Sequence, residues 1–126
     1  MLSVIIPTEG VERTAVATLA ALGLIIHPLP ADPIHPDGCF VEDTAILAFG
    51  RALLTRPGAV SRRGEVDSIA AALAPLLPLR RVEAPASLDG GDCLRVGDRM
   101  YVGRSARTDE AGIDAVRRAF PELRVV

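Results

Sequence analysis

The same order of secondary-structure elements is predicted twice in this chain, and this internal repeat limits the possible folds more than any other feature. Each copy reads as two short apolar strands, a helix and a third strand. The first copy is predicted at residues 39–49, 51–56, 61–77 and 80–84. The second copy is predicted at residues 92–96, 100–102, 108–120 and 123–126. Gly50 and Gly97 stand at the two hairpin turns, which favours tight loops there.

The two copies align with a period of roughly 45 residues once a three-residue insertion in the first copy is allowed. The alignment places an acid at the start of each copy and an arginine before each helix. The matched pairs are Glu42 with Asp89, Ser61 with Ser105, and Arg63 with Arg107. A unit of this size cannot bury its own faces, so we expect several units to pack around a shared centre.

The segment before the repeats is predicted to add a strand, a helix and a strand. Residues 2–6 form a β-branched run, residues 11–22 have helical spacing that stops before Gly23, and residues 24–29 return as an apolar strand. A chain of 126 residues is long enough to bury one core without disulfides or metals. We therefore expect one α/β domain.

Composition excludes several function classes. The chain has 14 basic and 16 acidic residues, a formal charge of −2, which gives no electrostatic footprint for nucleic acid or an anionic membrane. The longest apolar run is too short to span a bilayer, and the first residues lack the basic region of a signal peptide. Cys39 and Cys93 both fall in apolar stretches and are interpreted as buried thiols in a reducing compartment. These features predict a cytoplasmic protein.

Three carboxylates and one aromatic ring lie on a single short segment. Asp37, Glu42 and Asp43 cluster around Phe40, where a proline-rich loop is expected to become a strand. Acids so close repel one another unless a cation binds, and a flat guanidinium suits carboxylates beside an aromatic face. Taken singly, each acid is more often a turn or cap residue. Because Asp89 occupies the matched position in the second copy, a functional site is favoured as much as a turn or cap role for these acids.

Arginines stand at the turns into both repeat helices. Arg62 or Arg63 in the first copy and Arg107 in the second would oppose the acids, which suits a substrate with a cationic head and a carboxylate tail. The alternative is that they are solvated residues at helix starts, although the helix dipole disfavours arginine there. The Gly90-Gly91 pair allows close approach of a ligand or forms a plain turn.

The remaining titratable residues give no metal or cofactor signal. His27 lies in an apolar strand and is interpreted as a core residue, whereas His35 precedes a proline and is expected to face solvent. Neither histidine has a partner at metal-ligand spacing, and the two cysteines form no CxxC motif. We therefore predict no metal and no cofactor.

Four motifs carry a resemblance to a known family. They are residues 35–43 (HPDGCFVED), 55–65 (TRPGAVSRRGE), 88–92 (LDGGD) and 101–107 (YVGRSAR). In order and spacing they resemble the dimethylarginine dimethylaminohydrolases, which belong with arginine deiminases and amidinotransferases to the pentein superfamily. The resemblance covers residues 11–126, and residues 1–10 diverge from it. It implies an incomplete α/β propeller, in which residues 1–126 form one partial domain with two to three of five ββαβ blades.

The resemblance also implies roles for individual residues. Asp37, Glu42 and Asp43 correspond to acids that grip the guanidinium of the substrate, with Phe40 beside it. Asp89 corresponds to an acid that engages the guanidinium and orients a catalytic histidine, so Asp43 and Asp89 are the predicted catalytic residues. Arg62 and Arg107 correspond to arginines that hold the amino-acid end of the substrate. In this family a cysteine thiolate attacks the guanidinium carbon and water releases citrulline and an amine.

The chain departs from the family pattern at the reacting groups. The family's catalytic histidine and nucleophilic cysteine have no counterpart among these residues, and Cys39 and Cys93 match other positions. A buried cysteine beside carboxylates is expected to have a raised pKa, the opposite of activation. One hypothesis is therefore a portion of a guanidine-modifying hydrolase, inactive alone, that a complementary half-chain completes. The alternative is a non-catalytic module that binds guanidino ligands or self-associates through exposed sheet edges.

Overall fold

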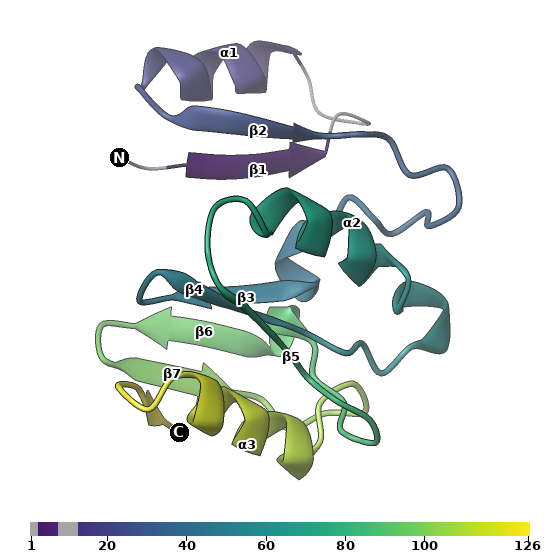
Figure 1. Cartoon of the computed structure of the whole chain (residues 1–126), viewed down its shortest axis with the longest axis vertical. Coiled ribbons are helices and arrows are strands. Elements are labelled where there is room, and N and C mark those ends of the chain that lie inside the picture. The colour runs from purple at the N-terminus through teal and green to yellow at the C-terminus, as the bar shows by residue number, and fades with distance from the viewer. Residues whose placement is uncertain (1–2, 8–12) are drawn as a thin grey trace.

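Three small sheets follow one another along the length of the molecule in the computed structural model, which describes residues 3–7 and 13–126 (Figure 1). The first sheet pairs β1 (Ser3–Pro7) with β2 (Ile25–Leu29) in parallel, and α1 (Arg13–Ala21) connects them. These elements match the predicted strand, helix and strand. Residues 2, 11 and 12 of those predictions, and half of the divergent start at 1–10, lie outside the described residues.

The two remaining sheets have the same topology, which confirms the repeat. The first unit is β3 (Ala45–Ala48), β4 (Arg51–Leu54), α2 (Glu65–Leu73) and β5 (Leu79–Arg81). The second unit is β6 (Cys93–Val96), β7 (Arg99–Val102), α3 (Glu110–Ala119) and β8 (Arg124–Val125). In each unit the first two strands are antiparallel and the third runs parallel to the second. Two ββαβ units and one βαβ segment agree with the predicted two to three blades.

Tight turns set the register of the hairpins. Phe49 and Gly50 connect β3 to β4, and both have positive φ angles, 49° and 68°. Consecutive positive φ angles are typical of the type I′ turn, whose twist matches that of the strands it joins. Gly97, the first of the two residues between β6 and β7, has a φ of 61°. The glycines that the sequence placed at the hairpin turns therefore adopt left-handed backbone conformations.

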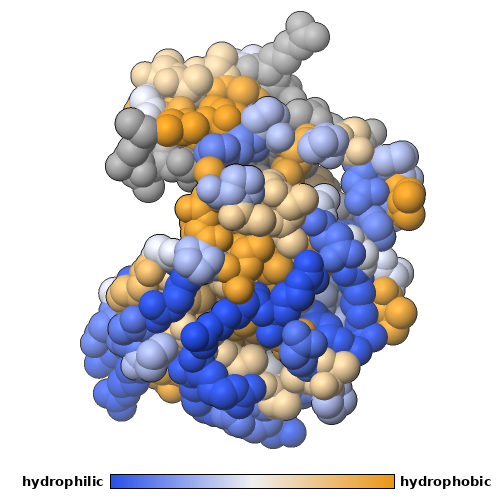
Figure 2. Space-filling model, in the orientation of Figure 1, coloured by the Kyte–Doolittle hydropathy of each residue, from blue (hydrophilic) through white to orange (hydrophobic). Residues whose placement is uncertain are grey.

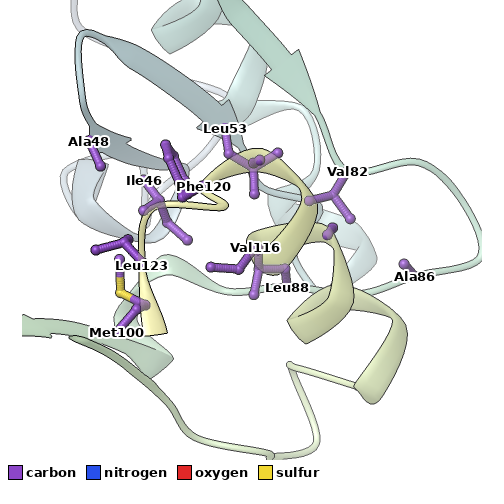
Figure 3. Close-up of a cluster of buried hydrophobic side chains, with 12 residues drawn as sticks. Ile46, Ala48, Leu53, Val82, Ala86, Leu88, Met100, Val116, Phe120 and Leu123 are labelled. Atoms are coloured by element: carbon purple, nitrogen blue, oxygen red, sulfur yellow. The ribbon is translucent and has the colours of Figure 1, made fainter. Parts of the chain in front are cut away.

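One hydrophobic core lies between the two repeat units, and the other lies mainly inside the first unit. One core joins β3 and β4 of the first unit to β7 and α3 of the second, with Phe120 and Val116 fully buried at its centre (Figure 3). A second core packs Leu29 of β2 against β4 and the buried face of α2. The first core therefore depends on both repeat units, as expected for a repeat that cannot bury all of its own faces.

Two predicted boundaries are wrong. Residues 39–49 do not form one strand, because the 3₁₀ turn η1 (Val41–Asp43) precedes β3 and Cys39 is exposed before it. The helix predicted from residue 61 begins at Glu65, after a separate 3₁₀ turn, η2 (Val60–Arg62). No helix in the described part of the chain is long and apolar enough to cross a membrane.

Candidate functional site

Two 3₁₀ turns from different repeats meet at the centre of the candidate site. They are η1 and η3 (Gly90–Asp92), and each stands directly before the first strand of its unit. A Cβ atom at Gly90 would lie 2.0 Å from the carbonyl oxygen of Glu42, so only glycine allows this approach. The Gly90-Gly91 pair therefore permits contact between the two turns, whether or not it also allows close approach of a ligand.

The contact between the turns brings the carboxylates of Asp43 and Asp89 together. Both residues are buried, and the Oδ1 atom of each lies beside Gly91, at 2.4 Å for Asp43 and 3.1 Å for Asp89 from the position of a Cβ added there. The pKa of Asp89 is raised, first by burial and then by its hydrogen bond to Asp43 and the negative charge there. Two buried acids in contact favour either a shared proton or a bound cation.

Arg62 is the cation nearest to Asp43. Its Nη1 donates to Asp43 Oδ2 at 2.7 Å, and its Nη2 donates to Glu65 Oε2 at 2.7 Å. Its Nε also donates to both Glu65 oxygens at 3.1 Å, and Nη2 donates to the Asp37 carbonyl at 3.2 Å. The acids hold Arg62 in its charged form and raise its pKa, with Glu65 the larger cause. The Oδ1 atom of Asp43 faces Asp89 instead.

Arg107 approaches the acid pair from the second repeat. Its Nη2 donates to Asp92 Oδ1 at 2.9 Å, and its Nη1 lies 3.6 Å from Asp89 Oδ2. Asp92 also accepts hydrogen bonds from the hydroxyls of Ser105 and Thr108, both at 2.7 Å. The side chain of Arg107 is 49% exposed, compared with 13% for Arg62. Arg107 therefore lies at the open side of the acid pair.

The structure brings some predicted site residues together and leaves others apart. Asp43, Asp89, Arg62 and Arg107 form one connected group. Asp37 and Glu42 have exposed side chains, and Phe40 is 50% exposed on the same segment. Acids and arginines were expected at opposite ends of a ligand, but both arginines pair directly with acids. The roles of all seven residues remain predictions.

Two acids of the site were not identified as site residues from the sequence. Glu65, which the sequence showed only as the last residue of the motif 55–65, is 3% exposed and pairs with Arg62. Asp92 organises the loop that carries Arg107. The three-residue spacing from Arg62 to Glu65 was the available signal, because residues three apart across a tight turn can pair.

The prediction that His35 faces solvent is wrong. Its Nδ1 lies 2.6 Å from Asp32 Oδ2, and its ring packs against Gly64, where an added Cβ would lie 2.5 Å from Nε2. This contact connects the acid-bearing loop to the start of α2. His27 is half-buried in β2.

Neither cysteine has the surroundings of a nucleophile. Burial, with smaller contributions from Asp92 and Asp89, raises the pKa of Cys93 to about 12. At pH 7 such a thiol is ionised in about one molecule in a hundred thousand. Cys39 is exposed rather than buried, because it lies in the turn before η1 instead of in a strand.

No family model matches the chain, but individual proteins do. The chain is 47% identical over 95 residues to an N(G),N(G)-dimethylarginine dimethylaminohydrolase of Streptomyces coelicolor, a match covering 75% of this chain and 36% of that protein. It is 44% identical over 86 residues to the protein of the same name from Pseudomonas aeruginosa, covering 67% and 34%. The chain thus spans about a third of the length of these curated relatives.

Solved structures extend the match to nearly the whole chain. The Pseudomonas aeruginosa protein, solved as a mutant complexed with citrulline, superposes with a TM-score of 0.84 at 30% identity. This match covers 99% of the present chain and 60% of the other. The α/β architecture described above is therefore that of part of a pentein.

Proposed function

Because this chain belongs to the dimethylarginine dimethylaminohydrolase family, of which it represents a partial domain, we propose that it carries the guanidinium-binding part of a hydrolase site. The ligand class is a guanidine with an amino-acid tail, such as arginine or a methylated arginine. The guanidinium would bind beside the contacting carboxylates of Asp43 and Asp89. Arg107, at the open side of this pair, would meet the carboxylate tail.

The contact between Asp43 and Asp89 is the observation that supports this proposal. Burial and the charge of Asp43 raise the pKa of Asp89, so the free site is strained electrostatically when both acids are ionised. A planar guanidinium offers N–H donors in two directions and can satisfy two carboxylates at once. Arg62 already neutralises Oδ2 of Asp43, which leaves Oδ1 facing Asp89 for a ligand.

The chain is not expected to complete the reaction alone. Nucleophilic attack on a guanidinium carbon requires a thiolate, and the raised pKa of Cys93 disfavours that form. Asp89 can instead hold a proton near the bound ligand or orient a base supplied by a complementary half-chain. We therefore propose a binding role for this portion and no citrulline production by the isolated chain.

Calorimetric titration of the whole chain tests the proposal. Arginine and asymmetric dimethylarginine should bind, and citrulline, which lacks the positive charge, should bind more weakly. Asp89→Asn should weaken arginine binding about tenfold or more, because it removes a charged hydrogen-bond acceptor. Asp67→Asn is the matched control, since Asp67 is exposed on α2 and pairs with Arg81. Absence of heat with both guanidines, or an equal effect of the two variants, would contradict the proposal.

Exposed hydrophobic side chains favour a second role, self-association. Leu94 on β6 and its cross-strand neighbour Tyr101 on β7 are 63% and 39% exposed, and Val96 and Leu47 are also exposed. Such side chains on small open sheets are typical of an interaction surface. We propose that a second copy covers them. Light scattering over a concentration series should show a dimer that Leu94→Lys dissociates, whereas a monomer at all concentrations would contradict this role.

A further inference from the structure

A second concave site lies between β5 and α3 and shares no residue with the acid pair. The pocket has a volume of about 440 Å³, within the range of small-molecule sites. Its lining combines mostly small apolar residues with charged residues. The buried apolar lining residues, which form the floor, are Leu53, Ala86, Ala115 and Ala119, and the exposed ones are Ala84, Pro85 and Ala111. In Figure 2, strongly hydrophilic residues lie over this part of the molecule and border smaller apolar surface.

The rim carries three arginines and one acid. Arg80 donates one hydrogen bond from Nη1 to the carbonyl of Arg118, at 3.3 Å, and Arg81 pairs with Asp67 at 3.1 Å. Arg118 forms no ion pair with any residue that the structure describes. Two guanidinium groups with unused donors therefore border an apolar floor, a combination that fits an anion with an apolar body.

Helix electrostatics alone do not account for this rim. Cations are favourable in the last turn of a helix, and both Arg117 and Arg118 occupy that turn of α3. Arg117 points to Glu110 and Asp114 on its own helix, with distances of 3.1 Å and 2.6 Å. Arg118 lines the pocket instead. The two neighbours thus differ in partners although they share the same helix dipole.

We propose that this pocket binds a small aliphatic carboxylate, with its head between Arg80 and Arg118 and its apolar tail on the alanine floor. Glu83 fixes the orientation. It lies at the boundary with a second pocket of about 250 Å³ that also contains Arg81 and Ala84. Its negative charge disfavours a carboxylate at that end. The proposal does not depend on the guanidine site, since none of the lining residues belongs to it.

Titration of the whole chain with hexanoate, followed by NMR, tests the proposal. Hexanoate should bind saturably, and both inorganic phosphate and hexylammonium should bind more weakly, since one lacks the tail and the other the negative charge. Arg118→Gln should weaken hexanoate binding about fivefold to tenfold, because it removes a charged donor. Arg117→Gln is the matched control and should leave the affinity unchanged. Equal weakening by both variants would show binding to general positive charge and overturn the proposal.

Two further variants test the floor and the orientation. Ala111 is exposed on α3 and lines the pocket, so Ala111→Phe should fill the pocket and abolish binding without entering the core. Glu83→Gln should tighten hexanoate binding, because it removes a repulsive charge. Unchanged binding in Ala111→Phe, equally tight binding of phosphate, or no saturable shift with hexanoate would each overturn the proposal. Far-UV circular dichroism of each variant confirms that it is folded.

Discussion

Replacing Arg62 with methionine should strongly destabilise the fold, because Arg62 is the cation that pairs with two buried acids. It forms short hydrogen bonds to Asp43 and Glu65, whose side chains are 12% and 3% exposed. Arg62→Met keeps most of the apolar stem and removes the guanidinium. The acids would then be buried without their partner, which is the situation in which breaking an ion pair is most unfavourable.

The size of the effect follows from burial. Removing one partner of a buried pair lowers stability by about 3–5 kcal/mol. Because the Arg62 side chain is 13% exposed, we expect Arg62→Met to lose about 3 kcal/mol, at the lower end of this range. For a domain of this length, such a loss lowers the melting temperature by about 10 °C. The matched control is Arg107→Met. Because that side chain is 49% exposed, solvent screening should limit its loss to about 1 kcal/mol.

Urea denaturation followed by circular dichroism measures both losses. The loss of stability in the double variant Arg62→Met/Glu65→Met should be smaller than the sum of the losses in the two single variants. The double variant leaves one fewer unpaired charge. A loss for Arg62→Met no larger than that for Arg107→Met would refute the reasoning. Simple additivity in the double variant would also refute it.

Three other predictions concern the contact between the turns and the cysteines. Gly90→Ala should lower stability by more than about 3 kcal/mol in the same assay, because the new Cβ would overlap a carbonyl oxygen of the facing turn. Gly103→Ala is the control and should change stability by less than about 0.5 kcal/mol, because the nearest atom to its new Cβ is 3.7 Å away. The pKa of Asp89 is higher in the folded chain than in the unfolded chain. The stability of the wild-type chain relative to Asp89→Asn should therefore be greatest at acidic pH and fall as the pH rises through the folded pKa. Thermal unfolding across a pH series that shows no such trend would be contrary evidence. Iodoacetamide at about pH 8 should modify Cys39 before Cys93, as mass spectrometry of the peptides would show, and the reverse order would contradict the raised pKa of Cys93.

The repeat was predictable from the sequence because its signals are local. Apolar runs of strand length, a turn glycine and a helical period occur twice, and both ββαβ units fold as those signals indicate. The boundaries near residues 39–43 and 61–65 were not predictable. There the chain forms 3₁₀ turns that depend on contacts distant in the sequence: η1 meets the second repeat where Gly90 approaches Glu42, and η2 is joined to η1 by the pairing of Arg62 with Asp43.

The site was predictable only in part for the same reason. The aligned repeats matched Asp89 with Glu42, the neighbour of Asp43, and the structure brings the carboxylates of Asp89 and Asp43 together. The pairing of Arg62 with Asp43 depends on where η2 lies relative to η1, and this placement is not encoded in any short motif. The pocket beside α3 has no sequence signal, because its floor alanines come from the loop after β5 and from the helix.

Carbon-13 NMR of the aspartate carboxyl groups, recorded against pH with and without a guanidinium ligand, tests the central claim most directly. In the free chain, we expect the pKa of Asp89 to lie above the usual range for an aspartate because of burial and Asp43. Saturating arginine should lower that pKa, since a cation beside the acid pair favours the ionised form of Asp89. An ordinary pKa for Asp89 in the free chain, or one that arginine does not change, would contradict a guanidinium site at this acid pair.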